Sequence, residues 1–341
     1  MSIPNLNATI DTVPKSHEAT YLDGKFQNAT PIPAFSLGDF WQYLKRAFTE
    51  STPNKVPEQS IPVLPITQEA LTRTQQDTLW RLGHSSILLK LNNEFWLLDP
   101  VFSERASPFQ FAGPKRFHQP PISIDELPPL AGVLISHNHY DHLDKSAVKA
   151  LNNKVERFIV PLGVGGDLRA WGVEANKIEE LDWWQSSGSK KVKITATPAH
   201  HFSGRGLSDR DKTLWASYVL ETGHSKLFFS GDSGYFDGFK KIGEHFGAFD
   251  LTLMETGAYD SLWPDVHMHP EESLQAHLDL NGKRLLPIHN GTFSLAFHSW
   301  TEPFEQIQQL AGAKGVDLAT PKMGEALALK GENHTSAWWK E

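Results

Sequence analysis

Four histidine and aspartate side chains crowd into one six-residue stretch, and this stretch constrains the fold more than any other feature. His137, His139, Asp141 and His142 directly follow the apolar run 133–135, which is typical of a buried strand. Neutral imidazole and carboxylate are good ligands for zinc, iron or manganese, and such close neighbours repel or desolvate one another unless a cation holds them. The alternative is a polar surface loop that happens to be rich in histidine. We predict a metal site on the loop at the end of this strand.

A loop this short cannot surround a single ion from all sides, so two adjacent ions sharing the loop are the simpler solution. Further ligands must then come from elsewhere in the chain. Polar residues that follow other apolar strands are candidates: His200 and His201 after residues 194–197, Asp232 after residues 227–230, and His289 after residues 285–288. Each of these alone is more typical of a loop residue. Together, beside a histidine-rich loop that lacks partners, they favour a metal centre.

The composition narrows the chemistry. The chain of 341 residues contains no cysteine, which excludes disulfides and thiolate ligands and favours hydrolytic metal chemistry over iron–sulfur sites. The formal charge of -8 and the absence of a lysine or arginine run make nucleic acid an unfavoured partner. The N-terminus shows no signal-peptide pattern and no window is apolar enough to span a membrane, so we expect a cytoplasmic protein, with peripheral membrane contact as a further expectation.

Two regions differ in pattern. Residues 1–70 contain scattered prolines and few periodic runs, which predicts an N-terminal arm wrapped on a catalytic domain at residues 71–341. Within the arm, residues 35–49 show the spacing of an amphipathic helix. Its apolar positions are Phe40, Trp41, Leu44 and Phe48, with the basic Lys45 and Arg46 between them. Such a helix either docks on the protein's own core or lies on a lipid surface.

From residue 77 onward short apolar strands alternate with helical patterns, which predicts a mixed α/β (α+β) domain with many strands. Strands are expected at 78–81, 86–91, 94–98, 132–135, 157–160, 191–197, 215–221, 226–230, 251–255 and 284–288. Helices are expected at 145–151, 166–171, 236–246, 270–280 and 302–313. No internal repeat of fixed period is evident.

The order of these motifs resembles the metallo-β-lactamase superfamily: His-x-His-x-Asp-His, a later histidine, the Gly-Asp-Ser-Gly segment at 231–234 and a final histidine. The resemblance implies a four-layer αβ/βα sandwich with the metals at the edge of two sheets. Separate segments narrow it to the branch that contains N-acyl-phosphatidylethanolamine-hydrolysing phospholipase D and its bacterial relatives. These segments are GHS at 83–85, LDPVFSERASP at 98–108, GPKRF at 113–117, LW at 214–215, GAY at 257–259, HMHPEE at 267–272 and IHNGTF at 288–293.

The resemblance implies a role for each candidate residue. It assigns His137, His139 and His201 to one ion, Asp141, His142 and His289 to the other, and Asp232 to a bridge between them. His201 is chosen over His200 because His200 stands where the family has a glutamine. The cofactors are then two divalent ions, expected to be zinc, with iron or manganese as alternatives. His267 corresponds to a histidine near the substrate, and His84 and Asp99 are expected to support the ligands rather than bind metal.

The implied reaction is hydrolysis of a phosphodiester of the N-acyl-phosphatidylethanolamine type, with Asp141, Asp232 and His267 as the catalytic residues. A hydroxide bridging the two ions would attack phosphorus, Asp232 would position it, and His267 or a metal-bound water would protonate the leaving group. The substrate is expected to be a lipid or another small molecule. Hydrolysis of a lactone, a cyclic nucleotide or another ester by the same fold is the alternative. Metal binding without catalysis is a third interpretation.

Overall fold

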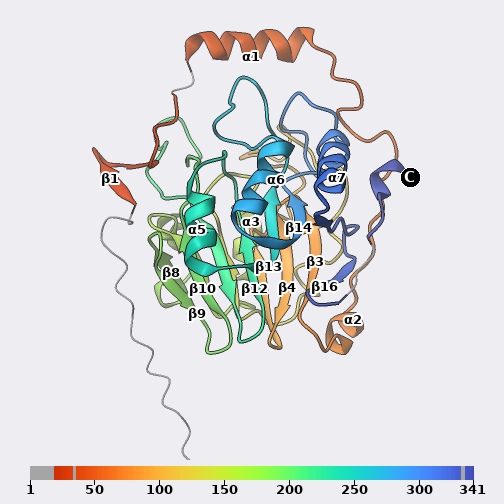
Figure 1. Cartoon of the computed structure of the whole chain (residues 1–341). Helices are drawn as coiled ribbons and strands as arrows, with labels where there is room; N and C mark the ends of the chain where they lie inside the picture. Colours follow the sequence, from red (N-terminus) through yellow and green to blue (C-terminus); the bar gives the residue numbers. More distant parts are fainter. Residues whose placement is uncertain (1–18, 34–35, 332–334) are drawn as a thin grey trace, which may run out of the picture.

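The computed structural model describes residues 19–33, 36–331 and 335–341. Two seven-stranded sheets face each other, and helices cover both outer surfaces (Figure 1). The first sheet has the order β16(Ala326–Ala328), β3(Thr78–Gly83), β4(Ser86–Leu91), β5(Glu94–Leu98), β6(Gly132–Leu134), β7(Phe158–Pro161) and β8(Ile178–Leu181). The second has the order β15(Asp317–Leu318), β14(Gly282–Ile288), β13(Phe249–Glu255), β12(Lys226–Phe229), β11(Ser217–Glu221), β10(Lys193–Thr197) and β9(Ser186–Gly188). The predicted four-layer αβ/βα sandwich is confirmed.

Apolar side chains on both faces of the strands hold the layers together. In β4, Ile87, Leu89 and Leu91 belong to the core between the sheets, whereas Leu88 packs under the helices of the first sheet. The alternation follows from the strand geometry, because successive side chains point to opposite faces. Both faces are covered, which explains why these strands read as almost continuous apolar runs.

The helices divide between the two outer layers. α2(Gln68–Arg73), α3(Lys145–Leu151) and α4(Gly165–Ala170) pack on the first sheet, and α5(Gly238–Phe246), α6(Pro270–Asp279) and α7(Glu302–Lys314) pack on the second. The expected helices are present, with boundaries that differ by at most two residues from the predicted ones. Sequence patterns missed β8, β9, β15 and β16, the edge strands of the two sheets, because strands of two to four residues are too short to show a period.

Strand direction brings distant loops together. Within the first sheet β5, β6 and β7 run parallel, and within the second β12, β13 and β14 run parallel. The carboxyl ends of parallel strands meet at one edge of a sheet, so the loops that follow them lie side by side. These loops carry the polar residues predicted to bind metal.

The described part of the arm runs along this domain. It contains the hairpin of β1(Thr20–Leu22) and β2(Lys25–Gln27), where the backbone N–H of Phe26 donates to the carbonyl of Asp211 at 2.8 Å. Further on, the Thr52 hydroxyl donates to the carbonyl of Phe297 at 3.0 Å. These contacts are compatible with an arm that lies on the domain. The boundary of the arm at residue 70 stays a prediction. Residues 1–18 lie outside the described residues.

The helix expected at 35–49 is α1(Leu37–Thr49), and it stands at one end of the sandwich, away from both sheets (Figure 1). Arg46 and Tyr43 attach one face of it, through an ion pair with Asp260 at 2.6 Å and an edge contact with the Phe297 ring at 5.6 Å. Phe35 and the side chain of Phe40 lie outside the described residues.

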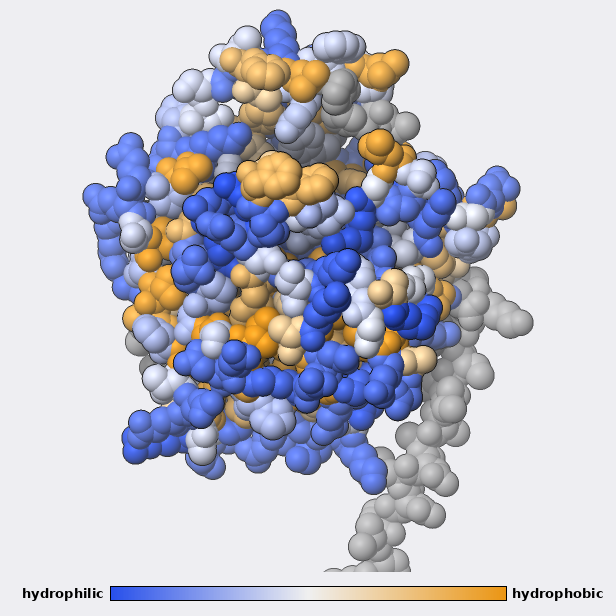
Figure 2. All heavy atoms as spheres, turned by 180° about the vertical axis from the view of Figure 1, so that it is seen from behind, coloured by the Kyte–Doolittle hydropathy of each residue, from blue (hydrophilic) through white to orange (hydrophobic). Residues whose placement is uncertain are grey.

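Three large apolar side chains of α1 face outward instead of inward. Leu37, Trp41 and Phe48 are 80%, 67% and 86% exposed, so docking on the protein's own core is wrong for these residues. Apolar side chains gather on the surface at this end of the molecule (Figure 2). Within the described residues, no helix combines the length and apolar character needed to cross a membrane.

Candidate metal centre

The histidine-rich loop after β6 lies at the edge where the strand ends meet. His84 reaches this edge from the turn between β3 and β4, and the remaining ligand candidates come from the ends of β10, β12 and β14. Within the loop, His139 and Asp141 line the cavity above the metal centre, whereas the Tyr140 hydroxyl donates to the carbonyl of Arg205 at 2.9 Å. The alternation points ligand candidates to one side of the loop and Tyr140 to the other.

The first set of donor atoms consists of His137 Nε2, His139 Nδ1, His201 Nε2 and Asp232 Oδ2, which lie within 4.8 Å of one another. His139 Nδ1 is 2.9 Å from His137 Nε2 and 3.3 Å from His201 Nε2. Asp232 Oδ2 is 3.7 Å from His137 Nε2 and 3.8 Å from His201 Nε2. Tetrahedral ligands at zinc bond lengths of about 2.0–2.1 Å lie about 3.3 Å apart, so these spacings fit one ion.

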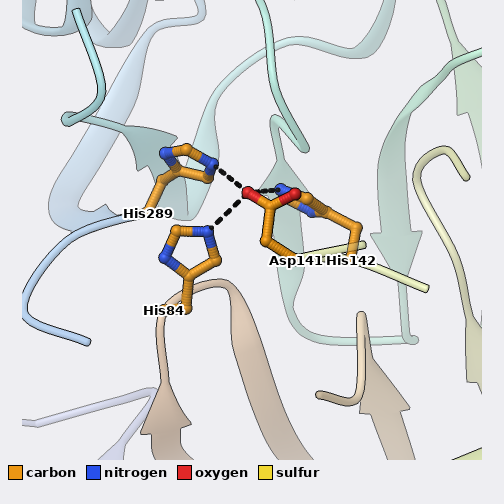
Figure 3. Close-up of side chains that lie close together, drawn as sticks. All are labelled: His84, Asp141, His142 and His289. Atoms are coloured by element: carbon orange, nitrogen blue, oxygen red, sulfur yellow. Dashed lines mark hydrogen bonds and ion pairs between the residues drawn. The ribbon is translucent and has the colours of Figure 1, made fainter. Parts of the chain in front are cut away.

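The second set surrounds one oxygen of Asp141 (Figure 3). Asp141 Oδ2 is 3.1 Å from His84 Nε2, 3.2 Å from His289 Nε2 and 3.5 Å from His142 Nε2. Sequence reasoning gave His84 only a supporting role, yet the structure places its ring nitrogen among the donor atoms. The position of His84 Nε2 is compatible with two roles: a fourth donor to a second ion, or a supporting hydrogen bond to Asp141.

Asp232 joins the two sets. Its Oδ1 is 3.0 Å from His142 Nε2, and its Oδ2, already part of the first set, is 3.1 Å from His289 Nε2. Both His142 Nε2 and Asp232 Oδ1 are buried, and although they form an ion pair with each other, neither makes a hydrogen bond of acceptable geometry in the described part of the chain. Buried polar atoms without hydrogen bonds are costly, and two cations would satisfy them. The donor set therefore fits two adjacent metal ions.

The outer ring nitrogens of the ligands are held by other groups. His142 Nδ1 contacts Asp99 Oδ2 at 2.6 Å, and Asp99 Oδ1 accepts from the backbone N–H of Ser136 at 2.7 Å. His201 Nδ1 pairs with the carbonyl of Val266 at 2.9 Å. Such partners fix the ring orientation and leave the other nitrogen free for a metal, which is the supporting role expected of Asp99.

The structure separates the adjacent histidines 200 and 201. His201 is fully buried among the donor atoms, whereas the ring of His200 stacks on Phe236 at 5.9 Å, in none of the metal-binding sets. The arm contributes here, because the Asn28 amide donates to the carbonyl of His201 at 2.7 Å and accepts from its backbone N–H at 3.2 Å. Nothing in the sequence around Asn28 predicted this contact.

Electrostatics differ between the sets. Burial lowers the pKa of His137 and His201 well below the usual value and lowers that of His139 to about 4, so these rings are neutral and able to bind a metal at neutral pH. Burial also opposes charge on His289, but Asp232 and its hydrogen bonds raise the His289 pKa to about 10. Burial also opposes charge on His142, but the carboxylates of Asp232, Asp141 and Asp99 raise its pKa well above the usual value. In the metal-free protein, protons therefore offset the carboxylates in the second set.

Glu255, the last residue of β13, is a buried carboxylate that sequence reasoning missed. Its Oε2 accepts from the backbone N–H of Ser233 at 2.6 Å, and its Oε1 contacts Nδ1 of His267. Burial and the neighbouring Asp232 raise the pKa of Glu255 well above its usual value. Glu255 could have been identified by the pattern that identified His289, because both are polar residues at the end of an apolar strand.

The backbone of His289 is held in an uncommon conformation, with φ +63°. The following Asn290 donates through Nδ2 to the carbonyls of Thr256 and Ile288, both at 3.0 Å. Arg81, which is fully buried, donates to the carbonyl of Asn290 at 2.7 Å and to its side-chain oxygen at 2.5 Å. Strain of this kind persists where the surroundings fix it, and here it presents the imidazole to the metal centre.

A cavity of about 460 Å³ lies above the donor atoms. Its floor includes His139, Asp141, Asp232 and His267. Most of the wall is apolar and comprises Ile32, Pro33, Phe202, Ala258, Leu262, Trp263, Pro264, Val266 and Leu295, with Asp39, Arg210 and Asp265 among the lining residues. An apolar cavity with a few converging polar groups is the usual form of a small-molecule site.

Comparisons with known proteins agree with this geometry. A family model described as a beta-lactamase superfamily domain matches residues 96–290. An uncharacterized protein of Mycobacterium tuberculosis is 40% identical over 327 residues, which cover 94% of this chain and 87% of the relative. The N-acyl-phosphatidylethanolamine-hydrolyzing phospholipase D 1 of Caenorhabditis elegans is 34% identical over 301 residues, covering 83% of this chain and 85% of the relative. An isothiocyanate hydrolase from Delia radicum gut bacteria shares the fold, with a TM-score of 0.60 at 17% identity over 74% of this chain and 98% of that chain.

Proposed function

This chain belongs to the metallo-β-lactamase superfamily, and we propose that within it the protein is a dinuclear hydrolase of phosphodiester bonds in N-acylated phospholipids. The observation that carries the proposal is the pair of donor sets joined by Asp232 beneath an apolar cavity. The N-acyl-phosphatidylethanolamine-hydrolyzing relative, which this chain matches over most of its length, supports the substrate class.

The proposed ligands are those of the two donor sets. His137, His139 and His201 hold one divalent ion, and Asp141, His142 and His289 hold the other, with Asp232 between them and His84 as an additional donor to the second. Zinc is the ion we expect, with iron or manganese as alternatives, because imidazole and carboxylate suit all three. When bound, two such ions ionise a water near neutral pH and offset charge that develops on phosphoryl oxygens.

The protein's own residues orient the reacting groups. Asp232 contacts both sets, because its Oδ2 lies near His137 as well as His289. Its Oδ1 lies near His142, whose ring Asp99 fixes. His267 lies in the cavity with Nδ1 engaged by Glu255, so its Nε2 is the nitrogen available to the substrate. Burial lowers the pKa of His267 to about 4, so its ring is neutral, and burial raises the pKa of Glu255, so that a protonated Glu255 can donate to Nδ1 and leave the ring proton on Nε2. We assign His267 Nε2 as the group that delivers this proton to the leaving alcohol, since a catalytic acid must lie within hydrogen-bond reach of the oxygen it protonates.

The surroundings of the cavity favour a lipid. Its wall is mainly apolar, and Asp39 of α1 contributes to it, so the exposed apolar stripe of α1 stands beside the site. Leu37, Trp41 and Phe48 point outward at helical spacing, with the basic Lys45 on the same helix. An amphipathic helix of this kind binds at a lipid surface by burying its apolar face. We propose peripheral membrane contact through α1, which would bring the cavity to its substrate.

The test is release of phosphatidic acid from N-acyl-phosphatidylethanolamine in vesicles, followed by mass spectrometry with zinc-loaded protein. The Asp232→Asn variant and chelated protein are the matched controls. We expect product from the loaded protein and at least a hundredfold less from either control, roughly the loss seen when a key electrostatic group is removed. Turnover of a lactone or a cyclic nucleotide without any phospholipid product would overturn the proposed substrate class.

A further inference from the structure

A second cavity, of about 390 Å³, lies behind the metal-binding loop. Tyr140 lines it, whereas its neighbours His139 and Asp141 line the catalytic cavity, so the loop forms a wall between the two spaces. We call this space the Tyr140 cavity. It shares no lining residue with the catalytic cavity, and no role proposed above uses it.

Arg205 and two aromatic rings form one wall of the Tyr140 cavity. The guanidinium carbon of Arg205 is 3.9 Å from the centre of the Tyr140 ring and 5.2 Å from that of Trp171. Nη1 of Arg205 donates to the carbonyls of Asn138 and Leu143, both at 2.7 Å. This wall is fixed in place by hydrogen bonds and stacking, as a preformed site requires.

The charges that line the cavity do not cancel. The Asp144 carboxylate accepts hydrogen bonds from the backbone N–H groups of Phe102, Ser103 and Ser146, at 3.1, 2.8 and 2.8 Å. Burial raises the pKa of Asp167, but the nearby charge of Arg205 and a hydrogen bond from the Asn138 side chain stabilise its carboxylate. The two acidic groups are therefore satisfied from within the protein.

Two cations make no ion pair at the cavity, although the charge of Arg105 also acts on Glu104, whose carboxylate pairs with Lys115 at 2.8 Å. Arg105 donates to the carbonyls of Gln110 at 3.1 Å and Gly113 at 2.6 Å, which offer no negative charge. Lys145 places its ammonium 6.0 Å from the centre of the Trp171 ring. Among residues 19–33, 36–331 and 335–341, no carboxylate oxygen lies within 4.0 Å of the charged nitrogens of either residue. A concave site with uncompensated positive charge attracts anions.

We propose that the Tyr140 cavity binds a small organic anion, with Arg105 and Lys145 contacting its acidic group and Trp171 contacting a flat apolar part. The volume is in the range of ordinary small-molecule sites, and the combination of aromatic walls with a few charged groups is the usual composition of such sites. The inference is independent of the proposed phospholipid hydrolysis, because it uses none of the residues of the catalytic cavity.

The probe is benzenesulfonate, a flat anion that is a weak metal ligand, and methyl phenyl sulfone is its uncharged counterpart. Binding to the metal-loaded protein is measured by calorimetry. Lys145→Glu is compared with Lys149→Glu, a matched change on the same helix at an exposed residue that does not line the cavity. Thermal unfolding confirms that both variants are folded.

We expect one saturable site for benzenesulfonate, unchanged in Lys149→Glu and weakened about tenfold or more in Lys145→Glu, since a charged hydrogen bond contributes about 1.5–3 kcal/mol. The sulfone should bind at least about tenfold more weakly than the anion. Absence of saturable binding, equal binding of the sulfone, or equal binding by the two variants would each overturn the proposal. Equal binding by the variants would place the anion at the metal centre instead.

Discussion

Replacing His201 and, separately, its neighbour His200 by alanine distinguishes a ligand from a packing residue at adjacent positions. His201 is fully buried, and its Nε2 is 3.3 Å from His139 Nδ1 in the first donor set. Binding of a structural zinc ion by four ligands provides about 10–16 kcal/mol, so removal of one ligand should cost about 3 kcal/mol. That loss corresponds to about a hundredfold weaker binding of one ion.

His200 should behave differently. Its ring stacks on Phe236 and belongs to neither donor set, so His200→Ala should keep both ions and lose only packing, about 1 kcal/mol of unfolding free energy. The assay is metal content by mass spectrometry after dialysis against a buffered low concentration of zinc, with thermal unfolding of both variants. His201→Ala should retain one ion and His200→Ala two. The reverse pattern would refute the assignment of His201 as the ligand.

Three further expectations concern the helix and the second donor set. Phe48→Asp should weaken vesicle binding about thirtyfold, because burial of an 86% exposed phenylalanine in the lipid contributes about 2 kcal/mol. Thr49→Asp should have a much smaller effect. Equal effects of the two variants in a vesicle sedimentation assay would contradict membrane insertion of α1. Asn290→Ala should weaken binding of the second ion about 10–100-fold by releasing the backbone of His289, and unchanged affinity in a chelator competition would argue against this role. The pKa values of His142 and His289 are raised in the metal-free protein, so both rings carry protons at neutral pH that the ion must displace. Affinity for the second ion should therefore fall about tenfold per pH unit for each displaced proton as the pH is lowered from 8 to 6. Affinity that does not change with pH would contradict the protonation of these two ligands.

The convergence of the main ligand candidates was predictable because each follows an apolar strand. Asp232 and His289 follow β12 and β14, which run parallel within the second sheet, and the loop after β6 reaches the same edge from the first sheet. Parallel strands deliver their following residues to one edge, whatever the sequence separation. The strand pattern therefore indicated the site before any contact was known.

Other parts of the site depend on tertiary contacts that leave no pattern in a single sequence. His84 reaches the donor atoms from a tight turn at φ +53°, and Asn28 reaches His201 from the end of the β1–β2 hairpin of the arm. For α1, the spacing predicted a helix, but spacing alone cannot decide whether an apolar stripe packs inward. The attachment of its other face by Arg46 and Tyr43 turned the stripe outward.

Zinc titration of the metal-free protein, with phosphatidic acid release from N-acyl-phosphatidylethanolamine measured at each step, tests the two-ion hydrolase most directly. Asp232 belongs to the first donor set and also contacts His142 and His289 of the second, so both ions are needed to complete the site. We expect activity to rise until two zinc ions are bound per chain and to stay constant beyond that ratio. Full activity with one ion or none, or no phosphatidic acid at any zinc level, would contradict the two-ion phosphodiesterase.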